Sequence, residues 1–209
     1  MCSSDLAYAI GAAGAIEAKE NGIGIWLTPA LNIHRNPLCG RNFEYFSEDP
    51  LISGKFASAK VQGIQSQKVG ATAKHFCCNN KEGNRRFSDS RVSERALREI
   101  YLRGFEICVK ESQPWLIMNS YNILNDRRCC TGYEQIQGIL RDEWGFEGLV
   151  ISDWGTPCDQ TYCVLSGNDV RMPSGDEAIL KESLENGRLK REHLEICAKR
   201  ICEMILKLD

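Results

Sequence analysis

The sequence predicts an α/β fold, an incomplete (β/α)8 TIM-type barrel in which parallel strands alternate with helices. Apolar runs of strand length alternate with segments of helical periodicity. No hairpin signal separates consecutive strands, which favours parallel pairing. Chemically reactive residues follow the strand ends, and in a barrel such ends converge on one face, whereas a doubly wound sheet would spread them along an edge. Only four or five strands can be counted, so the barrel is incomplete.

The chain is expected to begin with a helix and a strand. Residues 4–19 are rich in alanine, and the Asn21-Gly22 pair that follows is typical of a helix end. Residues 23–27 have the composition of a strand that is closed by Thr28-Pro29. A loop rich in polar and aromatic residues then extends from 31 to 46.

Two capping residues mark the next helices. Asp49 lies directly before Pro50, a combination that favours a helix start, and this helix should run to about residue 67. A strand over 69–76 follows. Ser93 then caps a helix whose apolar residues recur at three- and four-residue steps.

The second half continues the alternation. In chain order it should contain a strand at 115–120, a helix at 131–144, a strand that starts at Leu149 and ends at Asp153, a short helix after Pro157, a strand at 167–172, a short helix from Asp176 and a closing amphipathic helix. The strand that precedes Asp153 is short and wholly apolar, as expected of a strand buried on both faces.

Composition indicates one globular domain over residues 1–209. Hydrophobic residues make up 43% of the 209 residues, charged residues 26%, and the net charge is −2. These values suggest neither a nucleic-acid surface nor a polybasic membrane patch. No apolar run has the length of a membrane span, and the first residues do not resemble a signal peptide. We therefore expect a cytoplasmic protein that binds neither nucleic acid nor membrane.

The cysteine count is high and odd. Eleven cysteines include the adjacent pairs Cys77-Cys78 and Cys129-Cys130, which do not suit an orderly disulfide framework. They are expected to be small, mostly buried thiols. Cys158 and Cys163 are separated by four residues without a second ligand pair beside them, so no metal site and no cofactor are expected. A cysteine-based metal or redox protein is kept as a weaker alternative.

Several residues with useful chemistry follow the strand ends. They are one carboxylate, three cationic or imidazole groups and two aromatic groups: Asp153, Arg41, Lys74, His75, Tyr121 and Trp154. Nearby cations should depress the pKa of Asp153, so that it acts as a nucleophile or charge stabiliser. Donors and an aromatic plate suit a sugar ring, which favours a carbohydrate site. Each residue also has a structural interpretation, such as an Arg41–Glu44 loop pair or a hydrogen-bonded core histidine.

Long strings of this sequence resemble glycoside hydrolase family 3, most closely its β-glucosidase branch. The strings are residues 27–33, 35–37, 40–50, 70–76, 92–101, 120–122, 140–146 and Ser152-Asp153-Trp154-Gly155. The resemblance covers essentially the whole chain in order. It implies a retaining, exo-acting enzyme that hydrolyses terminal non-reducing β-D-glucosyl or related residues of a small β-glycoside or oligosaccharide, with Asp153 as nucleophile.

The resemblance also assigns roles around Asp153. It implies that Arg41, Lys74 and His75 hold sugar hydroxyls, that Tyr121 lies close to the nucleophile and that Trp154 lines the sugar pocket. Glu44 and Arg85 fall inside matching strings and receive supporting roles.

Some features of the family are missing from this chain. In the β-glucosidase branch the acid/base is a Glu on a separate α/β sandwich domain, which we expect to be needed in cis or in trans. The first barrel strands and a sugar-binding Asp are also missing, and Cys39 stands where Gly is usual. The hexosaminidase branch is rejected, because its loop histidine is absent from residues 79–86. The alternative function is a catalytically inert, truncated sugar-binding module.

Overall fold

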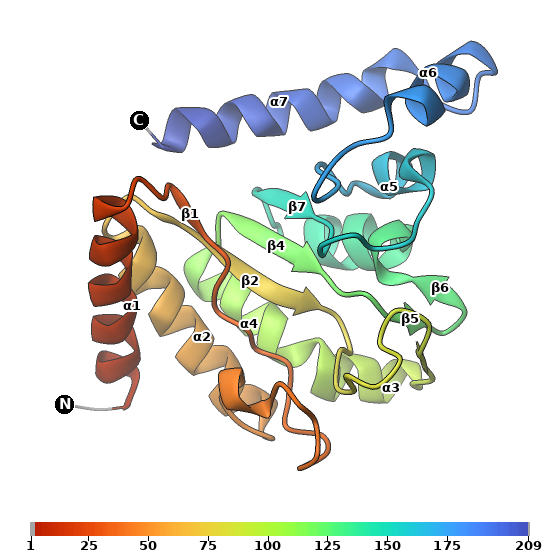
Figure 1. Cartoon of the computed structure of the whole chain (residues 1–209). Coiled ribbons are helices and arrows are strands. Elements are labelled where there is room, and N and C mark those ends of the chain that lie inside the picture. Colours follow the sequence, from red (N-terminus) through yellow and green to blue (C-terminus); the bar gives the residue numbers. More distant parts are fainter. Residues whose placement is uncertain (1–2, 209) are drawn as a thin grey trace.

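The computed structural model describes residues 3–208, so residues 1, 2 and 209 of the expected domain lie outside the described residues. Its centre is a parallel sheet of four strands in the order β1-β2-β4-β7 (Figure 1). The strands are β1 (Ile25–Trp26), β2 (Gly70–Phe76), β4 (Leu116–Asn119) and β7 (Leu149–Ile151). Neighbouring strands follow one another along the chain with helices between them, as in part of a (β/α)8 barrel. The predicted fold class is therefore confirmed.

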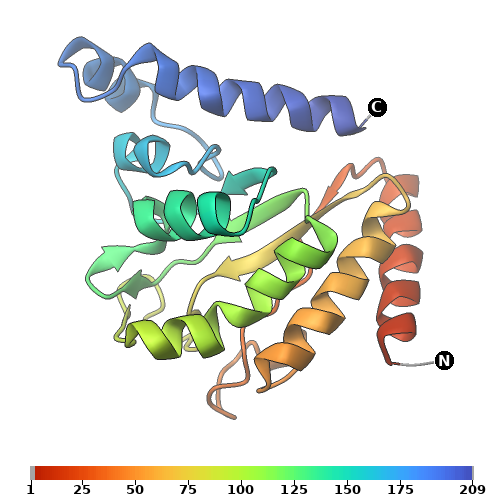
Figure 2. The same ribbon diagram turned by 180° about the vertical axis from the view of Figure 1, so that it is seen from behind.

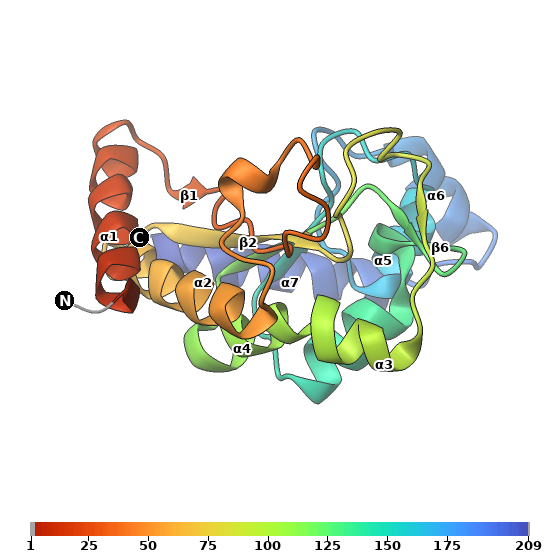
Figure 3. The same ribbon diagram turned by 90° about the horizontal axis from the view of Figure 1, so that it is seen from below.

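Helices connect and cover these strands. Their bounds are α1 Ser3–Glu20, η1 Asn42–Glu44, α2 Pro50–Gln65, α3 Glu94–Ala96, η2 Leu97–Tyr101, α4 Arg103–Ser112, η3 Cys129–Thr131, η4 Glu134–Glu143, α5 Gln160–Ser166, α6 Glu177–Glu185 and α7 Arg191–Leu208. Figure 2 shows α2, α4 and η4 side by side over one face of the sheet. Figure 3 shows the loop that carries η1 on the other side.

Alternate residues of the strands enter two separate apolar layers. Ile117 and Val150 belong to the large core beneath α2, α4 and η4. Their neighbours in sequence, such as Met118 and Ile151, instead pack with Met204 of α7. Because side chains alternate across a strand, these two layers lie on opposite faces, and the sheet is buried on both, as its apolar composition predicts.

Helix α2 begins as predicted, and its buried face agrees only in part with the prediction. Asp49 caps it by accepting a hydrogen bond from the Leu51 amide at 2.7 Å. The periodicity of the sequence predicts an inward face of Ile52, Phe56, Ala59 and Gly63. Gly63 is buried and Phe56 and Ala59 are half-buried, but Ile52 is 44% exposed, and Gly54 is buried instead. A Cβ atom at Gly54 would lie 2.8 Å from Cβ of Ile107 in α4, so a small residue here lets the two helices approach closely.

The expectation that the chain contains no hairpin is wrong. A second, small sheet has the order β3 (Asp89–Ser90), β5 (Ile123–Leu124) and β6 (Arg127–Arg128), and β5 and β6 are antiparallel. Asn125 and Asp126 connect them with φ angles of 47° and 73°. Two such residues with positive φ suit a tight hairpin turn. The Asn-Asp signal was missed because its flanking strands are only two residues long.

The expected fifth strand over 167–172 is reduced to one bridge, between Ile151 and Val170. The preceding residue, Asp169, is anchored by charge instead: its carboxylate lies 2.8 Å from both Arg141 and Arg200. The same carboxylate accepts a hydrogen bond from the Val150 amide at 2.8 Å.

Within residues 3–208, none of the helices combines the length and the apolar character that crossing a lipid bilayer requires.

Candidate active site

The strand ends bring the predicted site residues together. Lys74 and His75 lie near the C-terminal end of β2, Tyr121 follows β4 and Asp153 follows β7. Arg41, in the loop after β1, lies near enough for its charge to act on both His75 and Asp153. The convergence expected at one edge of a parallel sheet therefore occurs, and each residue contributes a specific contact.

Asp153 is buried and only half satisfied. Its Oδ1 accepts a hydrogen bond from the Trp154 amide at 2.7 Å. Its Oδ2 is buried without a hydrogen-bond partner among the described residues. The imidazole nitrogen Nε2 of His75 lies 3.8 Å from Oδ2, beyond hydrogen-bond distance. One carboxylate oxygen is thus left without the contacts that a purely structural carboxylate would make.

The pKa of Asp153 is raised, contrary to the expectation that nearby cations depress it. Burial is the largest cause, and it outweighs the Trp154 amide, the charges of Arg41 and Arg85 and the nearby Tyr121 hydroxyl, all of which lower the pKa. Arg41 is itself paired with Glu44, so part of its charge is already compensated. The charged form of Asp153 is therefore costly in the folded protein. Forming a bond to an electrophilic carbon would remove that charge.

His75 is a neutral, tightly held imidazole. Asn32 clamps its backbone: the Asn32 side chain accepts from the His75 amide and donates to its carbonyl, both at 2.9 Å. Burial, followed by the charges of Arg41, Lys74 and Arg85, holds the pKa of His75 well below its usual value. Its Nδ1 is buried without a partner in the described part of the chain. The expected core histidine is present, but its ring retains unused hydrogen-bonding capacity.

Asn32 is a site residue that the sequence analysis missed. It lies in the string 27–33 that carried the family resemblance, but no property of an asparagine after a short strand indicates a backbone clamp. Asn32 and His75 are far apart in the sequence, and only the folded structure brings them into contact.

Glu44 holds two cations in place. Arg41 donates from Nε to Glu44, and Nζ of Lys74 lies 3.7 Å from the other carboxylate oxygen of Glu44. The structural interpretation of Arg41 and Glu44 as a loop pair is therefore correct, but the pair also reaches Lys74. Burial lowers the pKa of Lys74, and the charge of Glu44 opposes that effect. The result is a fixed, positively charged group of donors beside Asp153 and His75.

The two aromatic residues are connected through the backbone. The Tyr121 hydroxyl donates to the Trp154 carbonyl at 2.6 Å. The Arg85 guanidinium stacks over the Tyr121 ring at 4.5 Å, which gives Arg85 a positioning contact. The Trp154 side chain is 56% exposed, so its indole forms an open plate next to Asp153 and does not line an enclosed pocket.

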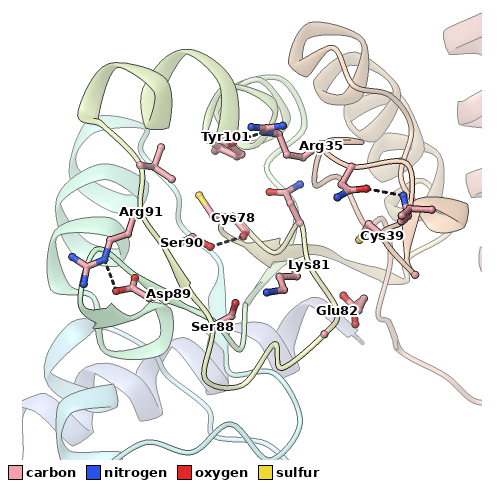
Figure 4. Close-up of a pocket in the computed structure, with 16 residues that line it drawn as sticks. Arg35, Cys39, Cys78, Lys81, Glu82, Ser88, Asp89, Ser90, Arg91 and Tyr101 are labelled. Carbon is pink, nitrogen blue, oxygen red and sulfur yellow. Dashed lines mark hydrogen bonds and ion pairs between the residues drawn. The ribbon is translucent and has the colours of Figure 1, made fainter.

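A hollow of about 530 Å3 lies beside this cluster, between the loops around 35–40 and 78–92 (Figure 4). Arg35 donates to the Tyr101 hydroxyl at 3.2 Å on its wall. Its lining includes Lys81 and Glu82 but neither Asp153 nor His75. The hollow is therefore a neighbouring depression and not the site of the predicted chemistry.

Comparison with known proteins places the chain in a family. Residues 1–204 match the family described as "Glycosyl hydrolase family 3 N terminal domain". The chain is 55% identical over 193 residues to "Beta-glucosidase A" of Butyrivibrio fibrisolvens, covering 92% of the chain and 23% of that relative. It is 42% identical over 205 residues to "Exo-alpha-(1->6)-L-arabinopyranosidase" of Bifidobacterium breve, covering 97% of the chain and 27% of that relative.

A solved structure agrees closely with this fold. Beta-glucosidase 3B from Thermotoga neapolitana, in complex with alpha-D-glucose, superposes with a TM-score of 0.95 at 46% identity, covering 98% of this chain and 30% of that chain. The chain spans between 23% and 30% of the length of these relatives. From the match over residues 1–204, we conclude that the chain belongs to the glycosyl hydrolase family 3 N-terminal domain family.

Proposed function

We propose that this chain is the nucleophile-bearing domain of a retaining β-glycosidase that removes terminal β-D-glucosyl or related residues from small β-glycosides. The observation that carries the proposal is the buried Oδ2 of Asp153, which has no hydrogen-bond partner within residues 3–208 and lies at the edge where β2, β4 and β7 end. In a double displacement this oxygen attacks the anomeric carbon, the leaving-group oxygen departs, and water later hydrolyses the glycosyl ester.

The cluster around Asp153 supplies the sugar contacts. Arg41 and Lys74 are held by Glu44, and they and the ring of His75 offer donors to ring hydroxyls without further ordering. Because His75 is neutral, its imidazole can both donate and accept at a sugar hydroxyl. Trp154 offers an apolar plate to the ring face, and Tyr121 fixes the backbone of Trp154.

The acid/base must come from outside this group of residues. Glu44 lies in the cluster, but each of its carboxylate oxygens is held by a cation, one by Arg41 and one by Lys74. It is therefore not placed to protonate a leaving group, and general acid help is worth roughly 10²–10⁴-fold. We propose, as the resemblance to the β-glucosidase branch implies, that the acid/base is a Glu on an α/β sandwich domain joined in cis or supplied in trans.

A substrate whose leaving group needs no proton tests Asp153 in the chain itself. A dinitrophenyl β-glucoside, with fluorine replacing the hydroxyl next to the anomeric carbon, releases dinitrophenolate unaided, and the fluorine slows hydrolysis of the ester that remains. Mass spectrometry of a peptic digest should place one glycosyl group on Asp153. The Asp153→Asn variant should remain unlabelled, and the exposed control Asp142→Asn should label like the parent chain.

Labelling of another residue, or equal labelling of Asp153→Asn, would overturn the assignment of the nucleophile. Binding of gluconolactone without any labelling would favour the alternative, an inert sugar-binding module.

A further inference from the structure

Three thiols from separate parts of the chain meet behind the Asp153 loop. Cys130 lies in η3, Cys163 lies in α5, and Cys158 lies in the segment between Asp153 and α5. The Sγ atoms of Cys158 and Cys163 are 3.0 Å apart, and all three Sγ atoms lie within 4.8 Å of one another. The sequence offered only one pair of cysteines here, but the fold adds Cys130 as a third ligand.

The spacing suits one thiophilic cation. A tetrahedral zinc site has Zn–S bonds of about 2.3 Å, which requires sulfur atoms roughly 3.8 Å apart. The Cys158–Cys163 spacing of 3.0 Å is shorter than that value, and all three sulfur atoms lie within 4.8 Å of one another, so small side-chain adjustments would suffice. Soft thiolate ligands select Zn²⁺ or Cu(I) over the hard cations that carboxylates prefer.

The backbone around the thiols is fixed before any ion binds. The Ser166 hydroxyl lies 3.1 Å from the Cys130 carbonyl and 2.8 Å from the Cys163 carbonyl, which ties η3 to the end of α5. Asp159 caps the start of α5 by accepting from the Thr161 amide at 2.7 Å. Cys130 and Cys163 are buried, whereas Cys158 is partly exposed and gives an ion a path of entry. Such prior ordering lowers the entropy cost of binding.

Two cationic side chains lie near the cluster, because the charges of Arg171 and Arg128 act on Cys158. These two arginines would offset part of the negative charge that three thiolates bring.

We propose that Cys130, Cys158 and Cys163 bind a single thiophilic d¹⁰ cation, Zn²⁺ or Cu(I), as a structural site. Each metal–sulfur bond replaces an S–H bond, and the displaced protons leave to solvent, so no oxidant or reductant is consumed. The ion would fix residues 153–158 to α5 and η3. The site does not depend on glycosidase activity, and its test measures metal binding alone.

The test titrates the reduced, metal-free chain with Zn²⁺ under anaerobic conditions, and separately with Cu(I), against a chromophoric chelator. The three-thiol site is expected to bind one equivalent of Zn²⁺ or Cu(I) more tightly than the other cysteines of the chain bind it. The affinity for this one cation should fall by more than about a hundred-fold in each of the variants Cys130→Ser, Cys158→Ser and Cys163→Ser. Loss of a ligating group should cost more than loss of an outer-shell partner. Cys202→Ser, which removes an exposed thiol of α7, is the matched control and should bind like the parent chain.

Circular dichroism checks that each serine variant is folded. A variant that has lost its helices is replaced by the corresponding Cys→Ala variant. Equal binding by the parent chain and the triple variant C130S/C158S/C163S would show an adventitious ion only and overturn the proposal. Failure of the folded parent chain to bind either cation would overturn it as well.

Discussion

Two buried aspartates near the same strand, Asp153 and Asp169, have opposite environments. Both residues are 8% exposed. Asp169 uses both carboxylate oxygens, one with Arg200 and one with Arg141 and the Val150 amide, each at 2.8 Å. Asp153 uses one oxygen and leaves the other unpartnered within residues 3–208. The exposed fraction of the residue alone therefore does not distinguish a fully paired carboxylate from one with an unpartnered oxygen.

The difference lies in where the neighbouring cations are directed. Arg141 and Arg200 point their charge at Asp169. Around Asp153 the cations Arg41 and Lys74 are directed at Glu44 instead. A fully paired carboxylate stabilises the fold, whereas one whose partners are held away remains free to react.

The largest expected effect is loss of turnover at Asp153. In a protein that joins this domain to an acid/base-bearing domain, Asp153→Asn should lower kcat on an aryl β-glucoside by at least about a thousand-fold, since the amide cannot form the glycosyl ester. The corresponding Asp142→Asn change should leave kcat unaltered. Retention of turnover by Asp153→Asn would show that Asp153 is not the nucleophile, and its contrast with Asp169 would then have no functional meaning.

The second effect is on stability at Asp169. Asp169→Asn leaves Arg141 buried without its counter-charge, and breaking a buried pair costs about 3–5 kcal/mol. Urea denaturation at neutral pH should show this loss in the free energy of unfolding. Asp153→Asn, in the same assay, should show no loss. Equal destabilisation by the two variants would mean that both carboxylates are structural.

The third effect concerns the donors held by Glu44. Lys74→Met keeps the apolar stem of the side chain and removes its charge. A hydrogen bond to a charged group contributes about 1.5–3 kcal/mol, so gluconolactone affinity should fall roughly ten- to a hundred-fold. Calorimetric titration measures this affinity, with the exposed Lys181→Met as control. Unchanged affinity would assign Lys74 to the structural ion pair alone.

The smallest effect is a pH dependence of stability. Burial raises the pKa of Asp153 above its ordinary value of 3.8, so the folded state binds this proton more tightly than the unfolded state does. The charged form therefore costs stability above the folded-state pKa, and that cost is relieved as pH falls through it towards 3.8. Asp153→Asn should raise Tm slightly at neutral pH, and its advantage should shrink on acidification. A difference in Tm that does not vary with pH would contradict the raised pKa.

The sequence was most informative about features that depend on a single helix or strand. The apolar run before Asp153 predicted β7, and Asp49-Pro50 predicted the start of α2, because period and capping are local properties. The site residues were also predicted together, since parallel strand ends share an edge. Their environment was not, because the pKa of Asp153 depends on burial and on where Arg41 directs its charge.

Features that depend on contacts between distant segments were missed. The Asn32 clamp, the Arg141–Asp169–Arg200 network and the meeting of Cys130 with Cys158 all join residues far apart in the chain. Ile52 of α2 was also placed wrongly, because Gly54 packs closely on α4, and a hydrophobicity pattern does not reveal which helix will lie opposite.

The Asn32 amide holds the peptide of His75, and Nδ1 of the imidazole has no hydrogen-bond partner within residues 3–208. The main chain at this position is thus held through Asn32 and not through the ring. Because His75 is 1% exposed, a protein engineer who varies position 75 should keep Asn32 constant and choose replacements that fill the volume of the imidazole.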